Sequence, residues 1–218
     1  MDFYEFGARI AVLYIPLLLS LTIHEYAHGL VAKWKGDNTA DHRGRLTLNP
    51  IAHMDMIGTF LLPLTMIFFN SGIIGWGVPV PVDERNMKHP KRDMFWVAMA
   101  GPASNVLVAI LAAFCLAIFA TRFQDFKYSS GIEAISLALI RMNLVLAIFN
   151  LIPIHPLDGG KVLARFLPDE VNRKLEENQM VLGIVLMALM LSGLLTFLFA
   201  PVDKIALYFV SFAQLLVR

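Results

Sequence analysis

The sequence predicts an all-α integral membrane protein, a polytopic helix bundle with about five to six hydrophobic segments. Of its 218 residues, 57% are hydrophobic and only 16% are charged, whereas about a quarter of the residues are charged in soluble domains. The apolar residues gather in runs of about 20, the length that a helix needs to cross a bilayer. A net charge of +1, without basic runs, argues against a nucleic-acid partner. The lipid bilayer is therefore the expected surrounding.

The apolar segments follow one another without a long linker, repeat or low-complexity tract, so we expect one membrane-embedded domain over residues 1–218. The first run, 10–23, follows acidic residues and leads into His24, which favours a retained membrane helix over a cleaved signal peptide. The last run, 202–217, is shorter and more polar, and it either spans or lies at the interface. The segments between them that approach spanning length are 57–76, 94–120, 132–154 and 180–200.

Three polar connections, 33–56, 78–93 and 161–179, contain four Lys or Arg residues each. The positive-inside rule places all three on the cytoplasmic side. The apolar segment 57–76 lies between the first two connections, so it must return to the side from which it enters. We therefore predict a re-entrant hairpin there, shielded from lipid by the rest of the protein; on hydropathy alone a plain spanning helix is the alternative.

The motif His24-Glu25-Tyr26-Ala27-His28 follows the first apolar run. A spacing of four residues puts both imidazoles on one helix face, where they can bind one zinc ion, and Glu25 can act as a general base beside it. The alternative is a pair of interfacial histidines next to a snorkelling glutamate. Ionisable side chains at the end of a membrane helix are costly, which favours the functional interpretation.

A catalytic zinc needs a third protein ligand, and Asp158 is the candidate. It lies in the segment Asn150-Leu-Ile-Pro-Ile-His-Pro-Leu-Asp158-Gly159-Gly160, where prolines end an apolar helix and glycines permit an unusual backbone path. Taken alone, this segment is better explained by a generic helix-ending turn without metal. His155 is the competing third ligand. Arg141, in the middle of the preceding apolar run, has no evident partner.

Together, the two segments resemble the site-2 protease family of intramembrane zinc metalloproteases, in which H-E-x-x-H is paired with a distant N-x-x-P-x-x-x-L-D-G. The resemblance extends to Gly44–Pro50, to Gly75-Trp76 and to Ala100-Gly101-Pro102 with Asn105. It implies a compact bacterial-type member without PDZ or CBS modules and with one zinc per chain. The zinc ligands would then be His24, His28 and Asp158, the general base Glu25, and the polar groups lining the substrate site Asn105 and Asn150.

By this resemblance the expected function is that of an intramembrane zinc metalloendopeptidase of the HExxH type, which hydrolyses peptide bonds in or next to transmembrane segments during regulated intramembrane proteolysis. The partner is a transmembrane protein or peptide. The location is a bacterial or archaeal-type plasma membrane, with the active site towards the cytoplasm. The stretches 43–49 and 78–82 are candidates for a small irregular or β-like element that receives the substrate.

Two rival functions stay open at the level of the sequence. One is a proteolytically silent zinc-binding membrane protein that acts as a chaperone or transporter. A transporter would carry paired ionisable residues along several helices, whereas the ionisable cluster here is confined to the ends of two apolar runs. The other rival is a membrane hydrolase of non-peptide bonds. The physiological substrate and the oligomeric state do not follow from the sequence.

Overall fold

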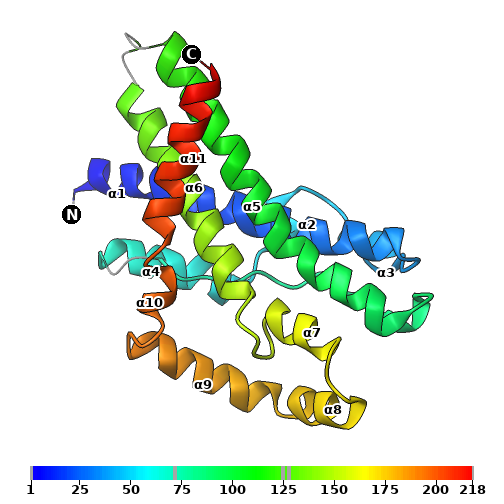
Figure 1. Cartoon of the computed structure of the whole chain (residues 1–218). Helices are drawn as coiled ribbons and strands as arrows, with labels where there is room; N and C mark the ends of the chain where they lie inside the picture. The colour runs from blue at the N-terminus through cyan, green and yellow to red at the C-terminus, as the bar shows by residue number, and fades with distance from the viewer. Residues whose placement is uncertain (1, 71–72, 124–125, 127–128, 218) are drawn as a thin grey trace.

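The computed structural model describes residues 2–70, 73–123, 126 and 129–217 (Figure 1). Within these ranges the chain is helical with irregular connections and contains no β-strand, which confirms the all-α class. Four of the described helical stretches are long and apolar enough to cross a membrane, which confirms a polytopic membrane protein. They are Phe3–Trp34, Pro90–Arg122, Ser129–Asn150 and Thr196–Val217.

The first stretch consists of α1 (Phe3–Arg9), a π-helical turn (Ile10–Tyr14) and α2 (Ile15–Trp34). Asp2 caps its beginning by accepting a hydrogen bond from the backbone N–H of Glu5. The H-E-x-x-H motif lies inside α2, which continues six residues beyond His28 before a short helix, α3 (Thr39–His42). The motif therefore has helical residues of α2 on both sides, although the apolar run ends at residue 23.

The segment after α3 returns to its starting point, as expected for a re-entrant hairpin. A π-helical turn (Met56–Leu61) leads into α4 (Leu62–Phe68). The backbone N–H of Trp76 then donates to the carbonyl of Gly58 at 3.1 Å, and that of Val78 to the carbonyl of His53 at 2.9 Å. The 13 helical residues from 56 to 68 rise only about 20 Å, less than the roughly 30 Å of a bilayer core.

Helix α5 (Pro90–Arg122) is the central element of the bundle and packs against α2, α6 (Ser129–Asn150) and α11 (Val202–Val217) (Figure 1). Its buried face is built mainly of small residues, which let neighbouring helix backbones approach closely. They are Ala98, Gly101, Ala109, Ala112, Ala113 and Ala117. The largest hydrophobic cluster lies where this face meets Ile140 and Leu144 of α6 and Val202 and Ala206 of α11.

The C-terminal third differs from the predicted segments. After α7 (Asp158–Ala164) and α8 (Asp169–Glu177), the apolar run 180–200 is divided into α9 (Gln179–Leu191) and α10 (Thr196–Phe199). Gly193 adopts a φ of 76° at the break, a left-handed conformation that ends a helix. The spanning stretch is instead α10 followed by α11 (Val202–Val217). The last run therefore belongs to a span.

Arg141 finds its partner in this part of the fold. Its Nε lies 2.8 Å from a carboxylate oxygen of Asp203, near the start of α11. The ion pair joins the middle of α6 to the fourth spanning stretch, which reduces the cost of a charge at membrane depth. The sequence alone had provided no basis for choosing this partner.

Candidate metal centre

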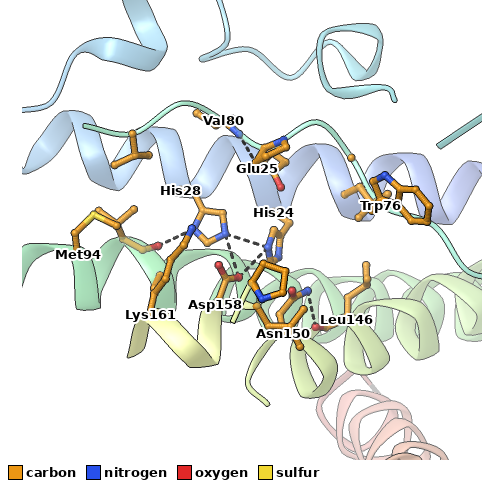
Figure 2. A pocket seen from close by; sticks show the side chains of 18 of the residues that line it. His24, Glu25, His28, Trp76, Val80, Met94, Leu146, Asn150, Asp158 and Lys161 are labelled. Atoms are coloured by element: carbon orange, nitrogen blue, oxygen red, sulfur yellow. Dashed lines mark hydrogen bonds and ion pairs between the residues drawn. The ribbon is translucent and has the colours of Figure 1, made fainter. Parts of the chain in front are cut away.

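The two histidines of α2 meet Asp158, the first residue of α7, in the interior of the bundle (Figure 2). The Nε2 atoms of His24 and His28 are 3.0 Å apart. One Asp158 oxygen, Oδ2, lies 3.1 Å from the first and 3.2 Å from the second. All three residues are buried. The structure thus brings together two segments that are more than 120 residues apart in the sequence, as their relative numbers show.

Both imidazoles are oriented by an oxygen behind them. Nδ1 of His24 is 2.6 Å from Oδ1 of Asn105, and Nδ1 of His28 is 2.7 Å from the carbonyl of Val97. An oxygen acceptor at Nδ1 calls for the proton there, so in each neutral ring Nε2 presents a lone pair. Two lone pairs and a carboxylate oxygen then face one another without a proton between them.

Such a convergence of three acceptors is repulsive unless a cation lies among them. Around a tetrahedral zinc with bonds of about 2.0–2.1 Å, neighbouring ligand atoms are about 3.3 Å apart. The separations of 3.0, 3.1 and 3.2 Å are close to this spacing. Oδ2 of Asp158 also has no hydrogen-bond donor among the described residues. The site therefore fits a zinc ion held by His24, His28 and Asp158.

Gly101 of α5 makes room for the imidazole pair. A Cβ atom at this position would lie 2.4 Å from Nε2 of His28 and 2.5 Å from Cε1 of His24. Real Cβ atoms do not approach other heavy atoms so closely, and both rings are fixed at Nδ1. Any side chain at position 101 would therefore displace the rings, which explains a glycine inside a long helix.

Asp158 reaches the histidines because the chain turns sharply after α6. Gly159 and Gly160, at the beginning of α7, pack directly against this turn, and a Cβ atom on Gly159 would be 2.3 Å from the carbonyl of Ile152. Burial by itself would raise the pKa of the Asp158 carboxyl, whereas positive charge on the facing imidazoles, when these are protonated, lowers that pKa below its usual value. A zinc ion at the same place would supply this positive charge while the imidazoles stay neutral.

Glu25 lies next to this group at a cavity of about 780 Å³. One of its carboxylate oxygens accepts a hydrogen bond of 2.8 Å from the backbone N–H of Val80 (Figure 2). Val80 belongs to the segment 73–82, which has no helix or strand. This segment forms one wall of the cavity, to which both Trp76 and Val80 contribute. The predicted element near the site is therefore irregular rather than a strand.

A buried carboxylate secures the far end of this wall. Asp37, after α2, accepts hydrogen bonds from Thr39, from the backbone N–H of Asp83 and from the side chain of Asn86. Burial would raise the pKa of Asp37, but these hydrogen bonds lower it below its ordinary value. This network connects the end of the motif helix to the segment that holds Glu25.

The remaining sequence candidates occupy different places. Asn150 lines the cavity, whereas Asn105 is completely buried behind His24. His155 is buried beside Gly160 and does not belong to the group of possible metal ligands formed by the described residues. Analysis of the sequence did not single out Gly101, the Val97 carbonyl or the Val80 N–H as parts of the site. Gly101 was noted only as part of the Ala100-Gly101-Pro102 motif. The Val97 carbonyl and the Val80 N–H are backbone groups, which no residue type reveals.

Comparison with known proteins agrees with this geometry. The sequence model of Peptidase family M50 matches residues 121–193, a range that includes Asn150 and Asp158. A Bacillus subtilis protein provisionally named zinc metalloprotease YwhC is 36% identical over 191 residues, covering 87% of this chain and 84% of that protein. The chain belongs to peptidase family M50.

Two less similar relatives of this M50 peptidase are longer proteins, and this chain aligns with a smaller share of each. A Mycobacterium tuberculosis H37Rv protein provisionally named zinc metalloprotease Rip2 is 31% identical, over 80% of this chain and 64% of that protein. Zinc metalloprotease MJ0392 of Methanocaldococcus jannaschii is 27% identical, over 72% of this chain and 34% of that protein. No solved structure gave a significant match.

Family membership confirms the resemblance to the site-2 proteases and the function expected from it, that of an intramembrane zinc metalloprotease. The four apolar spanning stretches confirm an integral membrane protein. The buried His, His and Asp group agrees with zinc as the cofactor. A silent chaperone or a transporter is not favoured by these comparisons.

Proposed function

We propose that this M50 peptidase hydrolyses a peptide bond of a transmembrane substrate inside a membrane-embedded cavity, with Glu25 of the HExxH motif as general base. His24, His28 and Asp158 hold one zinc ion. The observation that carries the proposal is the convergence of three buried donor atoms, within 4.8 Å of one another, at the cavity that Glu25 also lines. One membrane-embedded domain over residues 1–218 supplies all four of these residues.

Bound zinc supplies Lewis acidity, which activates water and polarises the scissile carbonyl. The protein contributes position and proton transfer. Glu25 accepts the proton of the attacking water through one carboxylate oxygen and passes it to the leaving amine. The backbone N–H of Val80 binds the other oxygen at 2.8 Å, which orients the carboxylate and leaves one oxygen free for the proton.

Reversible removal of metal tests this function. We expect 1,10-phenanthroline to abolish cleavage of a labelled transmembrane peptide by the purified protein in detergent, and added zinc to restore it, because the reaction depends on a metal ion. Mass spectrometry of the products locates the cleaved bond in or beside the apolar segment. The isomer 1,7-phenanthroline, which does not chelate zinc, is the matched control. Cleavage that continues at full rate with the chelator would contradict the proposal.

The active site faces the cytoplasm in the proposed orientation. The end of α2, the beginning of α5 and the end of α6 all lie on the side of the metal centre, and this side carries the three basic connections. Lys91 at the beginning of α5 also pairs with Asp169 of α8 at 2.8 Å. This contact keeps the third basic connection on the same side as the second.

Cysteine labelling tests the orientation. In a Cys115→Ser background, Glu170→Cys lies on the exposed face of α8 and Ser130→Cys at the opposite end of the bundle. We expect a membrane-impermeant maleimide to label Ser130→Cys in intact cells and Glu170→Cys only after permeabilisation. The reverse pattern would place the active site on the outer side.

A further inference from the structure

A line of buried polar side chains leads from the metal centre into the interface of α2, α5 and α6. Its members are Asn105, Asn143 and Ser20, none of which has exposed surface. Nδ2 of Asn105 donates to Oδ1 of Asn143 at 2.8 Å, and Nδ2 of Asn143 donates to Oγ of Ser20 at 2.8 Å. The Ser20 hydroxyl in turn donates to the carbonyl of Pro16 at 2.6 Å. The proposed proton transfer uses neither Asn143 nor Ser20.

The orientation of each amide along this line is determined by a backbone carbonyl. Nδ2 of Asn143 also donates to the carbonyl of Leu139 at 2.8 Å. A carbonyl can only accept, so the nitrogen of Asn143 must face it and the oxygen must face Asn105. An exchange of oxygen and nitrogen in Asn143 would place two acceptors against each other and leave buried groups without a hydrogen-bond partner, which is unfavourable.

The same argument determines which atom of the Asn105 amide faces His24. Nδ2 of Asn105 donates to Asn143 and, at 3.3 Å, to the carbonyl of Ser20, so the oxygen of Asn105 must face the imidazole. An amide oxygen can only accept, and His24 must therefore carry its proton on Nδ1. A neutral imidazole has one such proton. Nε2 is thus left with the lone pair that a metal ion requires.

His28 needs no such support, because the Val97 carbonyl that faces its Nδ1 belongs to the backbone of α5 and cannot reverse. The side-chain amide of Asn105 can reverse. If the NH₂ group of Asn105 faced Nδ1 of His24, the imidazole would carry its proton on Nε2, and Nε2 could not bind a metal ion. The tautomer of His24 therefore depends on Asn143, which holds the Asn105 amide in one orientation, whereas the tautomer of His28 does not.

We propose that Asn143 is a positioning residue of the metal centre. Through Asn105 it holds His24 in the tautomer with the proton on Nδ1, which presents Nε2 to zinc. This inference rests on the proposed function in taking His24 as a zinc ligand. It assigns a role to an asparagine that lies two α-helical turns before the end of α6 and touches neither metal nor substrate.

Zinc affinity is the first test, measured by competition with a chelating dye on the purified full-length protein. We expect Asn143→Leu to weaken zinc binding by up to about 10-fold, the low end of the effect of losing a direct partner of a ligating histidine, because Asn105 is then oriented only by its longer, 3.3 Å bond to the Ser20 carbonyl. Asn143→Asp keeps an oxygen that accepts from Asn105, and its burial against the Leu139 carbonyl favours the protonated acid, whose hydroxyl replaces the lost N–H donor. Its zinc affinity should therefore stay closer to that of the wild type than that of Asn143→Leu. Ser20→Ala should have a smaller effect than Asn143→Leu, because the Leu139 carbonyl still orients Asn143.

Thr22→Val is the matched control. The Thr22 hydroxyl is buried in α2 and donates to the carbonyl of Leu18 at 2.7 Å, and it takes no part in the hydrogen bonds that join Ser20, Asn143 and Asn105. Its loss should leave zinc affinity unchanged. If Asn143→Leu does not fold, Asn143→Ala removes the same oxygen without added bulk and should weaken binding in the same direction.

The tautomer of His24 is the second test, read from the nitrogen NMR signals of ¹⁵N-histidine in the zinc-free protein. We expect a protonated Nδ1 in the wild type and in Asn143→Asp, and a mixture of tautomers in Asn143→Leu. A lower melting temperature for Asn143→Leu and Asn143→Ala, with unchanged zinc affinity and tautomer, would reduce Asn143 to a structural role and overturn the inference. Retention of zinc by His24→Ala would instead overturn the proposed ligand set.

Discussion

Asp158→Ala is expected to lose its zinc during purification and to show no peptidase activity. The substitution removes one of three proposed protein ligands and leaves His24 and His28, whose Nε2 atoms are 3.0 Å apart, as the two remaining donors of this group. Elemental analysis of the detergent-purified protein checks the result. Wild type should contain about one zinc per chain.

His155→Ala is the matched control for this experiment, since His155 is also buried and lies only three residues before Asp158. It belongs to the turn rather than to the ligand group, so we expect it to keep its zinc. Full zinc occupancy in Asp158→Ala, together with loss in His155→Ala, would show that His155 is the third ligand.

Glu25→Gln is expected to lower kcat by about 10²–10⁴-fold, the usual contribution of a general base, while zinc stays at wild-type occupancy. Glutamine has nearly the same shape and can still accept the hydrogen bond from the Val80 N–H, but it cannot take a proton from water. The measurement is the single-turnover cleavage rate of a labelled transmembrane peptide, with zinc determined on the same sample.

The alternative outcomes for Glu25→Gln are distinguishable. Loss of zinc together with activity would mean that Glu25 supports the metal site and would leave its role as base unproven. Full activity with full zinc occupancy would show that another group accepts the proton, and the proposed mechanism would then be wrong.

The membrane architecture follows from the sequence where composition and charge act over long stretches. Hydropathy predicts three of the spans, and the basic connections on either side of 57–76 predict that this segment returns. The hydrogen bond between Trp76 and Gly58 agrees with that prediction. The division of the run 180–200 was missed because its apolar composition is continuous, and a single left-handed residue, Gly193, is enough to end α9.

The metal centre was predictable to the extent that its chemistry is carried by residue types in a local pattern. His24 and His28 are one helical turn apart, and the Leu-Asp-Gly segment supplies the third donor. The surroundings of these residues were not predictable, because they arise from helix packing. Asn105 lies 81 residues from His24, Asn143 lies 38 residues from Asn105, and the Val97 carbonyl has no signature in the sequence.

Zinc K-edge X-ray absorption of the protein loaded with one zinc per chain tests the central claim most directly. The site of His24, His28 and Asp158 predicts two imidazole nitrogens with additional oxygen ligands, at about 2.0–2.1 Å and without sulfur. Asp158→Ala, reloaded with excess zinc, should lose one oxygen ligand or fail to bind. A spectrum with three imidazoles, or with a sulfur ligand, would contradict the site.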